Sequence, residues 1–135
     1  MINKTRLNEA FKALRKHGFI ARQNFMCCGG CAGNKIAYEA EKLVDQGKTV
    51  AGGVFYHKQA GDNLREGRSF YVNFGRIESM KHGEIGTMTD EEIGRLVVKE
   101  FEAARLRVVW EGNTNTAILV EPGEPEPKTA WERLQ

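Results

Sequence analysis

Hydrophobic positions near the N-terminus recur at the spacing of one face of a helix. These positions are Leu7, Ala10, Phe11 and Leu14. The stripe predicts an amphipathic helix, and Gly18 stands where a glycine commonly follows a helix C-terminus. A second helical stripe runs from about Cys31 to Gln46 and is followed by Gly47. The first half of the chain therefore contains two predicted helices.

Alternation of apolar and polar side chains marks the strands. Three segments carry it, at residues 19–27, 49–57 and 69–77. The third segment is the most regular, since Phe70, Val72 and Phe74 share one face while Tyr71 and Asn73 share the other. Loops are predicted for the polar stretches that remain between the elements, 58–68 and 78–88.

The second half of the chain carries a helix start signal and a hairpin pattern. Thr89 and Glu92 form a T-x-x-E capping box, in which each side chain accepts a hydrogen bond from the backbone N–H of the other residue. An apolar stripe continues from there to Ala104. Residues 106–112 and 116–121 then predict two strands joined by a turn, which is a β-hairpin.

The order of these elements predicts an α+β fold. Without the first helix and the last strand it is βαββαβ, the ferredoxin-like arrangement of an antiparallel sheet with two helices on one face. We therefore expect a ferredoxin-like fold with an extra N-terminal helix and a C-terminal β-hairpin, in one domain of residues 1–121. Residues 122–135 hold all three prolines and Trp131, and we interpret them as a tail.

Composition and charge argue against several classes of function. The 135 residues are 41% hydrophobic and 28% charged, which is typical of a globular protein. A net charge of +2 gives no electrostatic reason to expect nucleic acid or a membrane as the partner. No stretch approaches the roughly 20 apolar residues of a membrane helix, and the N-terminus lacks the apolar core of a secretory signal. We therefore expect a cytoplasmic protein with reduced thiols.

All three cysteines lie in the stretch NFMCCGGCAG, residues 24–33. Cys28 and Cys31 form a C-x-x-C motif at the predicted start of a helix, where backbone N–H groups favour a thiolate. That spacing is typical of thioredoxin-like redox sites, but no proline precedes Pro122 to supply the cis-proline of that family. A redox site is therefore one interpretation of the cluster.

Metal binding and simple packing are the other two interpretations. Cys27, Cys28 and Cys31 are candidate zinc ligands, because the glycines around them let the backbone wrap around an ion. A closed zinc site needs a fourth ligand, and His57 is the best placed histidine, at the end of the second predicted strand. Free cysteines also pack as small apolar side chains. The sequence leaves all three interpretations open.

Two further sets of residues are candidates for binding. His57 lies near Gln59 and Asp62, and a thiol, an imidazole and a carboxylate are the parts of a cysteine-nucleophile site. On the third strand, Tyr71 and Asn73 face away from the expected core. The segment YVNF matches part of the aromatic motif of RNA-binding modules built on this kind of sheet.

Four stretches, GFIARQNFMCCGGCA, GGVFYHKQAGD, SFYVNFG and LRVVWEGNTNTAILVE, together span about residues 5–121. In their Cys-Cys-x-x-Cys turn, Phe-Tyr-His strand end and Trp-x-Gly hairpin they resemble a family of small uncharacterised bacterial and phage-borne domains of unknown function. The resemblance implies a compact intracellular α+β domain and favours treating Cys28, Cys31 and His57 as one unit. It assigns no activity.

These observations predict a small non-enzymatic binding or regulatory module whose Cys-rich turn, with or without zinc, helps to contact another protein. The alternatives are a thiol-dependent enzyme and a single-stranded RNA binder. The sequence indicates neither the identity of the partner nor the oligomeric state.

Overall fold

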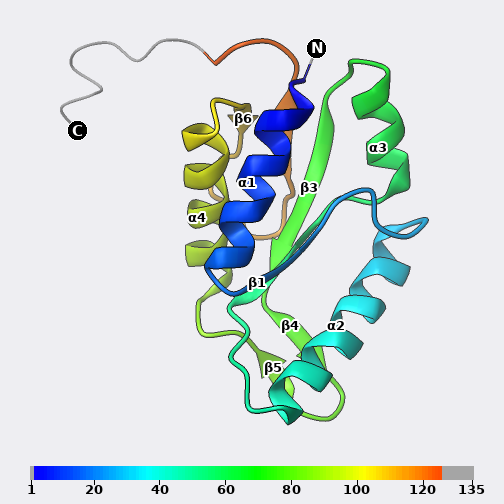
Figure 1. The fold of residues 1–135 in the computed structure, drawn as a ribbon, viewed down its shortest axis with the longest axis vertical. Coiled ribbons are helices and arrows are strands. Elements are labelled where there is room, and N and C mark those ends of the chain that lie inside the picture. The colour runs from blue at the N-terminus through cyan, green and yellow to red at the C-terminus, as the bar shows by residue number, and fades with distance from the viewer. Residues whose placement is uncertain (1, 126–135) are drawn as a thin grey trace, which may run out of the picture.

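The computed structural model describes residues 2–125, so the predicted tail beyond Pro125, including Trp131, lies outside the described residues (Figure 1). The elements follow one another as α1 (Lys4–Lys16), β1 (Phe19–Arg22), α2 (Gly29–Asp45), β2 (Gly52–Phe55), α3 (Lys58–Arg65), β3 (Phe70–Gly75), β4 (Ile77–Ser79), β5 (Gly83–Ile85), α4 (Asp90–Ala103), β6 (Arg107–Val109) and β7 (Ile118–Glu121). Among the helices of residues 2–125, none combines the length and the apolar character needed to cross a membrane.

Five strands form one mixed sheet in the order β1-β2-β3-β7-β6. β1 and β2 are parallel and are connected through α2, whereas the later neighbours in the sheet pair antiparallel. β4 and β5 form a separate two-stranded hairpin. The predicted α+β class is confirmed, and so is the C-terminal hairpin, which β6 and β7 form.

The strand order differs from the predicted ferredoxin-like arrangement, and the sheet is mixed rather than antiparallel. The ferredoxin-like arrangement inserts the third strand between the first two, but here β1 pairs directly with β2, with Phe19 beside Gly52. A parallel β-α-β unit can join neighbouring strands or leave room for a third strand between them, and the hydrophobic pattern does not distinguish the two arrangements. The helices differ from the prediction too, since α1 packs beside α4 on one face of the sheet, whereas α2 packs on the other face together with β4 (Figure 1).

The side chains of β1 divide between two apolar clusters, one on each face of the sheet. Phe19 and Ala21 belong to the larger cluster under α1 and α4, whose largest buried members are Tyr56, Phe11, Phe70 and Phe101. Ile20 belongs to the smaller cluster, which α2 covers with Ile36 and Ala40. The sheet near β1 and β2 is therefore covered on both faces, and the turn that follows β1 is held between packed elements.

The helix end signals in the sequence are confirmed. Thr89 Oγ1 accepts a hydrogen bond from the Glu92 N–H at 3.2 Å, and Glu92 Oε1 accepts one from the Thr89 N–H at 3.0 Å. Gly18 and Gly47 follow α1 and α2 with φ of +92° and +80°, a region in which glycine carries no steric penalty. These three signals fix the ends of the helices that cover the sheet.

The two predicted loops were wrong. Residues 58–68 contain α3, and residues 78–88 contain β5 and most of β4. α3 has only eight residues, of which Ala60 and Gly61 are buried, and β4 and β5 have three residues each. Elements this short contain too few apolar positions to show a period, so their order depends on contacts with the rest of the fold.

Candidate metal centre

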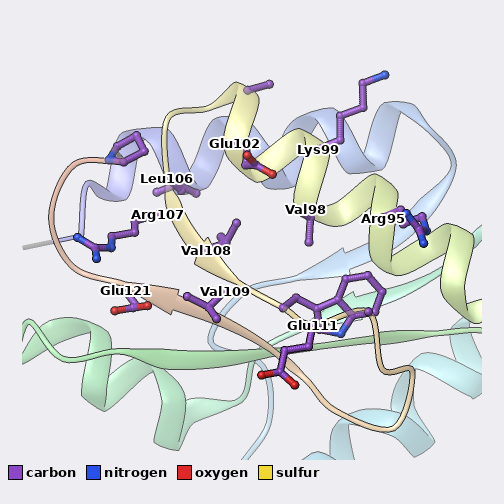
Figure 2. A pocket seen from close by; sticks show the side chains of 14 residues that line it. Arg95, Val98, Lys99, Glu102, Leu106, Arg107, Val108, Val109, Glu111 and Glu121 are labelled. Atoms are coloured by element: carbon purple, nitrogen blue, oxygen red, sulfur yellow. The ribbon is translucent and has the colours of Figure 1, made fainter. Parts of the chain in front are cut away.

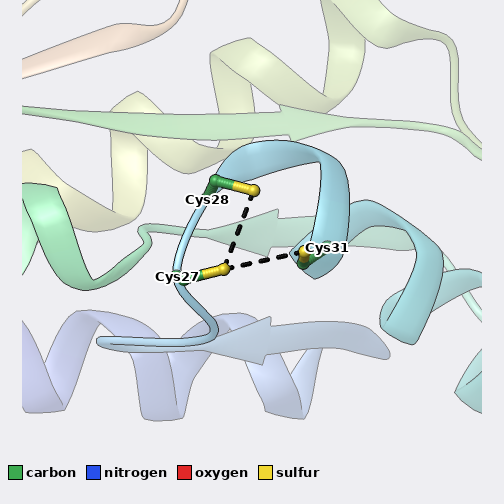
Figure 3. A group of neighbouring side chains, drawn as sticks. All are labelled: Cys27, Cys28 and Cys31. Carbon is green, nitrogen blue, oxygen red and sulfur yellow. Dashed lines mark hydrogen bonds between the residues drawn. The ribbon is translucent and has the colours of Figure 1, made fainter.

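The three cysteines lie together at the turn between β1 and α2. The Cys27 Sγ lies 3.9 Å from the Cys28 Sγ and 3.7 Å from the Cys31 Sγ (Figure 3). All three sulfur atoms lie within 4.8 Å of one another. Within residues 2–125 these cysteines are the only group of three or more His, Cys, Asp or Glu side chains arranged closely enough to hold one metal ion.

Left-handed backbone brings the thiols together. The predicted strand of residues 19–27 ends at Arg22, because Asn24 and Met26 adopt φ of +50° and +64°. Asn tolerates this region, whereas for Met it costs about 1–2 kcal/mol. Cys28 is extended and is the N-cap of α2, so Cys31 lies one helical turn further along, with its thiol back towards Cys27.

The start of α3 holds this turn in place. The Phe25 N–H donates to the Tyr56 carbonyl at 2.9 Å, and the Lys58 N–H donates to the Met26 carbonyl at 3.0 Å. The Asn24 side chain lies against Gly61 of α3, where a Cβ would collide with its Oδ1. Asn24 and Gly61 are thus positioning residues that the sequence did not indicate. The tolerance of Asn for left-handed backbone was the one available signal.

Met26→Gly is expected to stabilise the protein relative to Met26→Ala by about 1 kcal/mol, because only glycine adopts the left-handed backbone without strain. Both variants remove the exposed Met26 side chain, so the difference between their free energies of unfolding reports mainly the strain of the backbone. Urea unfolding of the two variants measures it. An alanine variant as stable as the glycine variant would show that Met26 is not strained.

The thiols differ in their affinity for the proton. At the start of α2, the backbone N–H of Cys31 and the neighbouring thiols of Cys31 and Cys27 lower the pKa of Cys28. Hydrogen bonding with the Cys28 and Cys27 thiols, together with the negative charge of their thiolates, raises the pKa of Cys31 to about 11. Cys27 and Cys31 are exposed and Cys28 is half-buried, so all three are open to a metal ion or a reagent.

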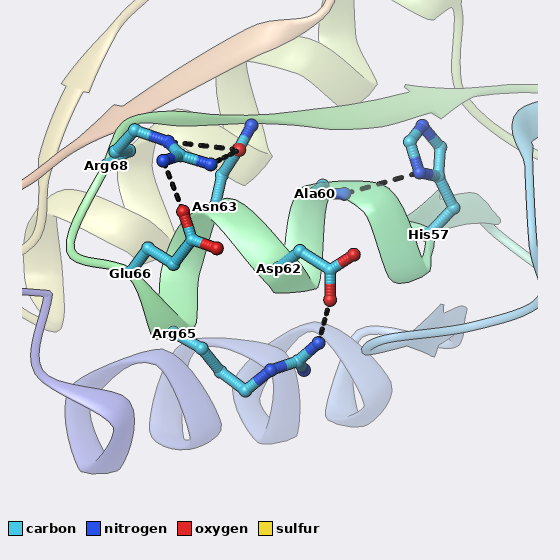
Figure 4. Close-up of polar contacts among 7 residues, drawn as sticks. All are labelled: His57, Ala60, Asp62, Asn63, Arg65, Glu66 and Arg68. Carbon is cyan, nitrogen blue, oxygen red and sulfur yellow. Dashed lines mark hydrogen bonds and ion pairs between the residues drawn. The ribbon is translucent and has the colours of Figure 1, made fainter.

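His57 does not join the sulfur cluster in the described structure. It is the N-cap of α3, and its Nδ1 accepts a hydrogen bond from the Ala60 N–H at 3.4 Å (Figure 4). Asp62 pairs with Arg65, and Gln59 is exposed. The imidazole and the carboxylate are therefore engaged with other groups, and the structure does not bring them together with a thiol as a nucleophile site.

The other predicted binding residues, Tyr71 and Asn73, lie on β3. The Tyr71 side chain is 58% exposed, on the face opposite to the buried Phe70 and Val72. Asn73 is half-buried, and it borders a small cavity of about 430 Å³ between α2 and the sheet. The open part of this face thus carries Tyr71, whereas Asn73 belongs to the edge that α2 covers.

One comparison with known proteins identifies a family. A family model described as "Domain of unknown function (DUF6891)" matches residues 2–126. The chain belongs to this family. The match extends over almost the whole chain and includes the cysteine turn, so the resemblance to a family of unknown function is confirmed. No curated protein and no solved structure matches the chain.

Proposed function

We propose that this protein is a zinc-binding module in which Cys27, Cys28 and Cys31 are ligands. The sulfur spacing carries the proposal. Two sulfur ligands of a tetrahedral zinc site lie about 3.8 Å apart when each Zn–S bond is about 2.3 Å. The distances from the Cys27 Sγ to the other two sulfur atoms, 3.9 Å and 3.7 Å, already match that spacing.

His57 is the fourth ligand in this proposal. The hydrogen bond between Lys58 and Met26 ties the start of α3 to the cysteine turn, whereas His17 pairs with Glu100 and His82 with Asp45 elsewhere on the surface. Nδ1 of His57 accepts a hydrogen bond, so in the neutral ring Nε2 carries the proton. Coordination therefore requires the ring to release the Ala60 N–H and turn towards the thiolates.

Metal analysis of the untagged full chain tests the proposal. Plasma mass spectrometry is expected to find nearly one zinc per chain, and the thiols are expected to react with a disulfide reagent only after a chelator removes the metal. If the reduced protein, reconstituted with zinc, retains no metal on gel filtration and its thiols react equally fast with and without zinc, the proposal is wrong.

Two variants separate the ligand role of His57 from its capping role. Asn is a good N-cap residue but a poor zinc ligand, so His57→Asn retains the cap and removes the imidazole. His57→Ala removes both. If His57 is a ligand, both variants weaken zinc binding by about tenfold or more. If it acts only as a cap, the Asn variant binds zinc like the wild type. Spectra of the Co²⁺-loaded variants report the change in ligand.

The opposite shifts in the pKa values of Cys28 and Cys31 favour a second candidate function, reduction of disulfides. The Cys28 thiolate would attack a substrate disulfide and expel one thiolate. The Cys31 thiol would give its proton to that thiolate and attack the Cys28 Sγ, which releases the second thiolate and leaves a Cys28–Cys31 disulfide. Mass spectrometry after incubation with oxidised glutathione distinguishes this product from a stable mixed disulfide at Cys28.

A further inference from the structure

β6 is one of the two edge strands of the five-stranded sheet, and β1 is the other. Within the described part of the chain, β6 pairs with β7 on one side only. An open groove of about 1060 Å³ lies between α4 and β6 (Figure 2). Its walls include Val98, Leu106, Val108 and Trp110, with Arg95, Lys99 and Glu102 along α4. An edge with free backbone groups beside an apolar groove can accept another strand.

The edge sequence is complementary to itself. β6 ends at Val109. Together with the two residues that follow it, the segment 107–111 reads Arg-Val-Val-Trp-Glu, with opposite charges at the two ends and apolar side chains between them. In an antiparallel pair of two such segments centred on Val109, each Arg107 lies opposite the Glu111 of the other copy, and each Val108 lies opposite a Trp110. Directly opposed residues share a face of a sheet, and opposite charges in such pairs are favourable. This register therefore forms two Arg107–Glu111 charge pairs between the copies.

We propose that two copies of this chain pair through their β6 strands, antiparallel and centred on Val109, so that one sheet runs through both copies. Val108 and Trp110 are partly buried and pack against the apolar cluster beneath α4, so the pair of these residues lies on the groove side in both copies. Both α4 helices then lie on the same face of the joined sheet, and the second copy of β6 fills the open edge of the groove.

On the opposite face of the sheet, a row of apolar side chains crosses the strands and ends at the β6 edge. Val109 is 46% exposed and lies beside Leu119 of β7, which in turn lies beside Tyr71 of β3, 58% exposed. Pairing across the two copies places Val109 against its own symmetry mate and extends this row through the dimer. The proposal therefore accounts for the exposure of Val109 on the described surface, and it is independent of the cysteine site.

A charge-swap experiment on the full chain tests the register. Analytical ultracentrifugation over a range of concentrations is expected to show a dimer for the wild type. Glu111→Arg places two pairs of like charges across the axis, so we expect it to weaken the dimer by about tenfold or more. Arg107→Glu is expected to act likewise. The double variant, with both charges exchanged, is expected to restore the wild-type dimer.

Circular dichroism of each variant shows whether the fold is retained, because Arg107 also lies opposite Glu121 within the chain. A wild-type chain that stays monomeric at the highest soluble concentration overturns the proposal. The proposal is also overturned if the Glu111→Arg variant dimerises as tightly as the wild type.

Discussion

Zinc is expected to raise the melting temperature of the wild-type protein by about 10 °C at a hundredfold excess over its dissociation constant. At the proposed site the gain is expected because the sulfur atoms of Cys27, Cys28 and Cys31 are already close together in the folded chain, so zinc should bind the folded chain more tightly than the unfolded one. Cys31→Ser is expected to abolish this rise, since a serine hydroxyl is a poor zinc ligand. Differential scanning fluorimetry with and without zinc measures both effects.

The pH dependence of zinc affinity provides a second test of the same site. The pKa of Cys31 is raised to about 11, so its thiol holds a proton at neutral pH and must release it to bind zinc. Zinc affinity is therefore expected to rise as pH increases from 6 to 8. Cys31→Ser without zinc serves as the control, since its stability should resemble that of the metal-free wild type. A zinc-induced rise that survives Cys31→Ser would contradict the assignment of Cys31 as a ligand.

Secondary structure was predictable for elements that depend only on residues close together in the sequence. The stripe through Leu7 and Leu14, the capping box at Thr89 and the hairpin of β6 and β7 all depend on residues close together in the sequence. The direct pairing of β1 with β2 and the face of the sheet that each helix covers were not predictable, because both depend on contacts between segments far apart in the sequence. A helix stripe shows that a helix has a buried face, but it does not indicate the side of the sheet.

The candidate site was predictable in part for the same reason. The spacing of Cys27, Cys28 and Cys31 across a strand-to-helix turn made the three residues candidate ligands, and the structure brings their sulfur atoms within 4.8 Å of one another. The support for the turn comes from α3, a short polar segment that was predicted as a loop. The role of His57 as the cap of α3, and the contact of Asn24 with Gly61, follow from the position of that helix and leave no pattern in the sequence.

Tyr56→Ala is expected to destabilise the protein by about 3–5 kcal/mol, the range for removing a large buried aromatic side chain. Tyr56 is fully buried, and its ring contacts those of Phe70 and Phe11 with centroids 4.9 Å and 5.7 Å away. Its hydroxyl accepts a hydrogen bond from the Lys4 Nζ at 2.9 Å and donates one to the Gln23 Oε1 at 3.1 Å. Urea unfolding gives the change in free energy.

Tyr56→Phe is the matched control, because it retains the ring and removes only the hydroxyl. We expect it to cost about 1–2 kcal/mol, the value of lost hydrogen bonds to partly buried partners. Burial raises the pKa of Tyr56 to about 12, so the folded state holds the phenol proton more tightly than the unfolded chain, in which the pKa is about 10. This contribution to stability is complete below pH 10 and is lost as pH rises to 12.

The wild type should therefore lose stability over this alkaline range more steeply than Tyr56→Phe, which has no phenol to ionise. Equal slopes would show that the hydroxyl is already exposed in the folded state.

Residue 56 also links the apolar core to the cysteine turn, because its backbone carbonyl accepts a hydrogen bond from the Phe25 N–H. If zinc binds only the folded chain, excess zinc restores part of the stability that Tyr56→Ala loses, and it does not do so when Cys31→Ser is also present.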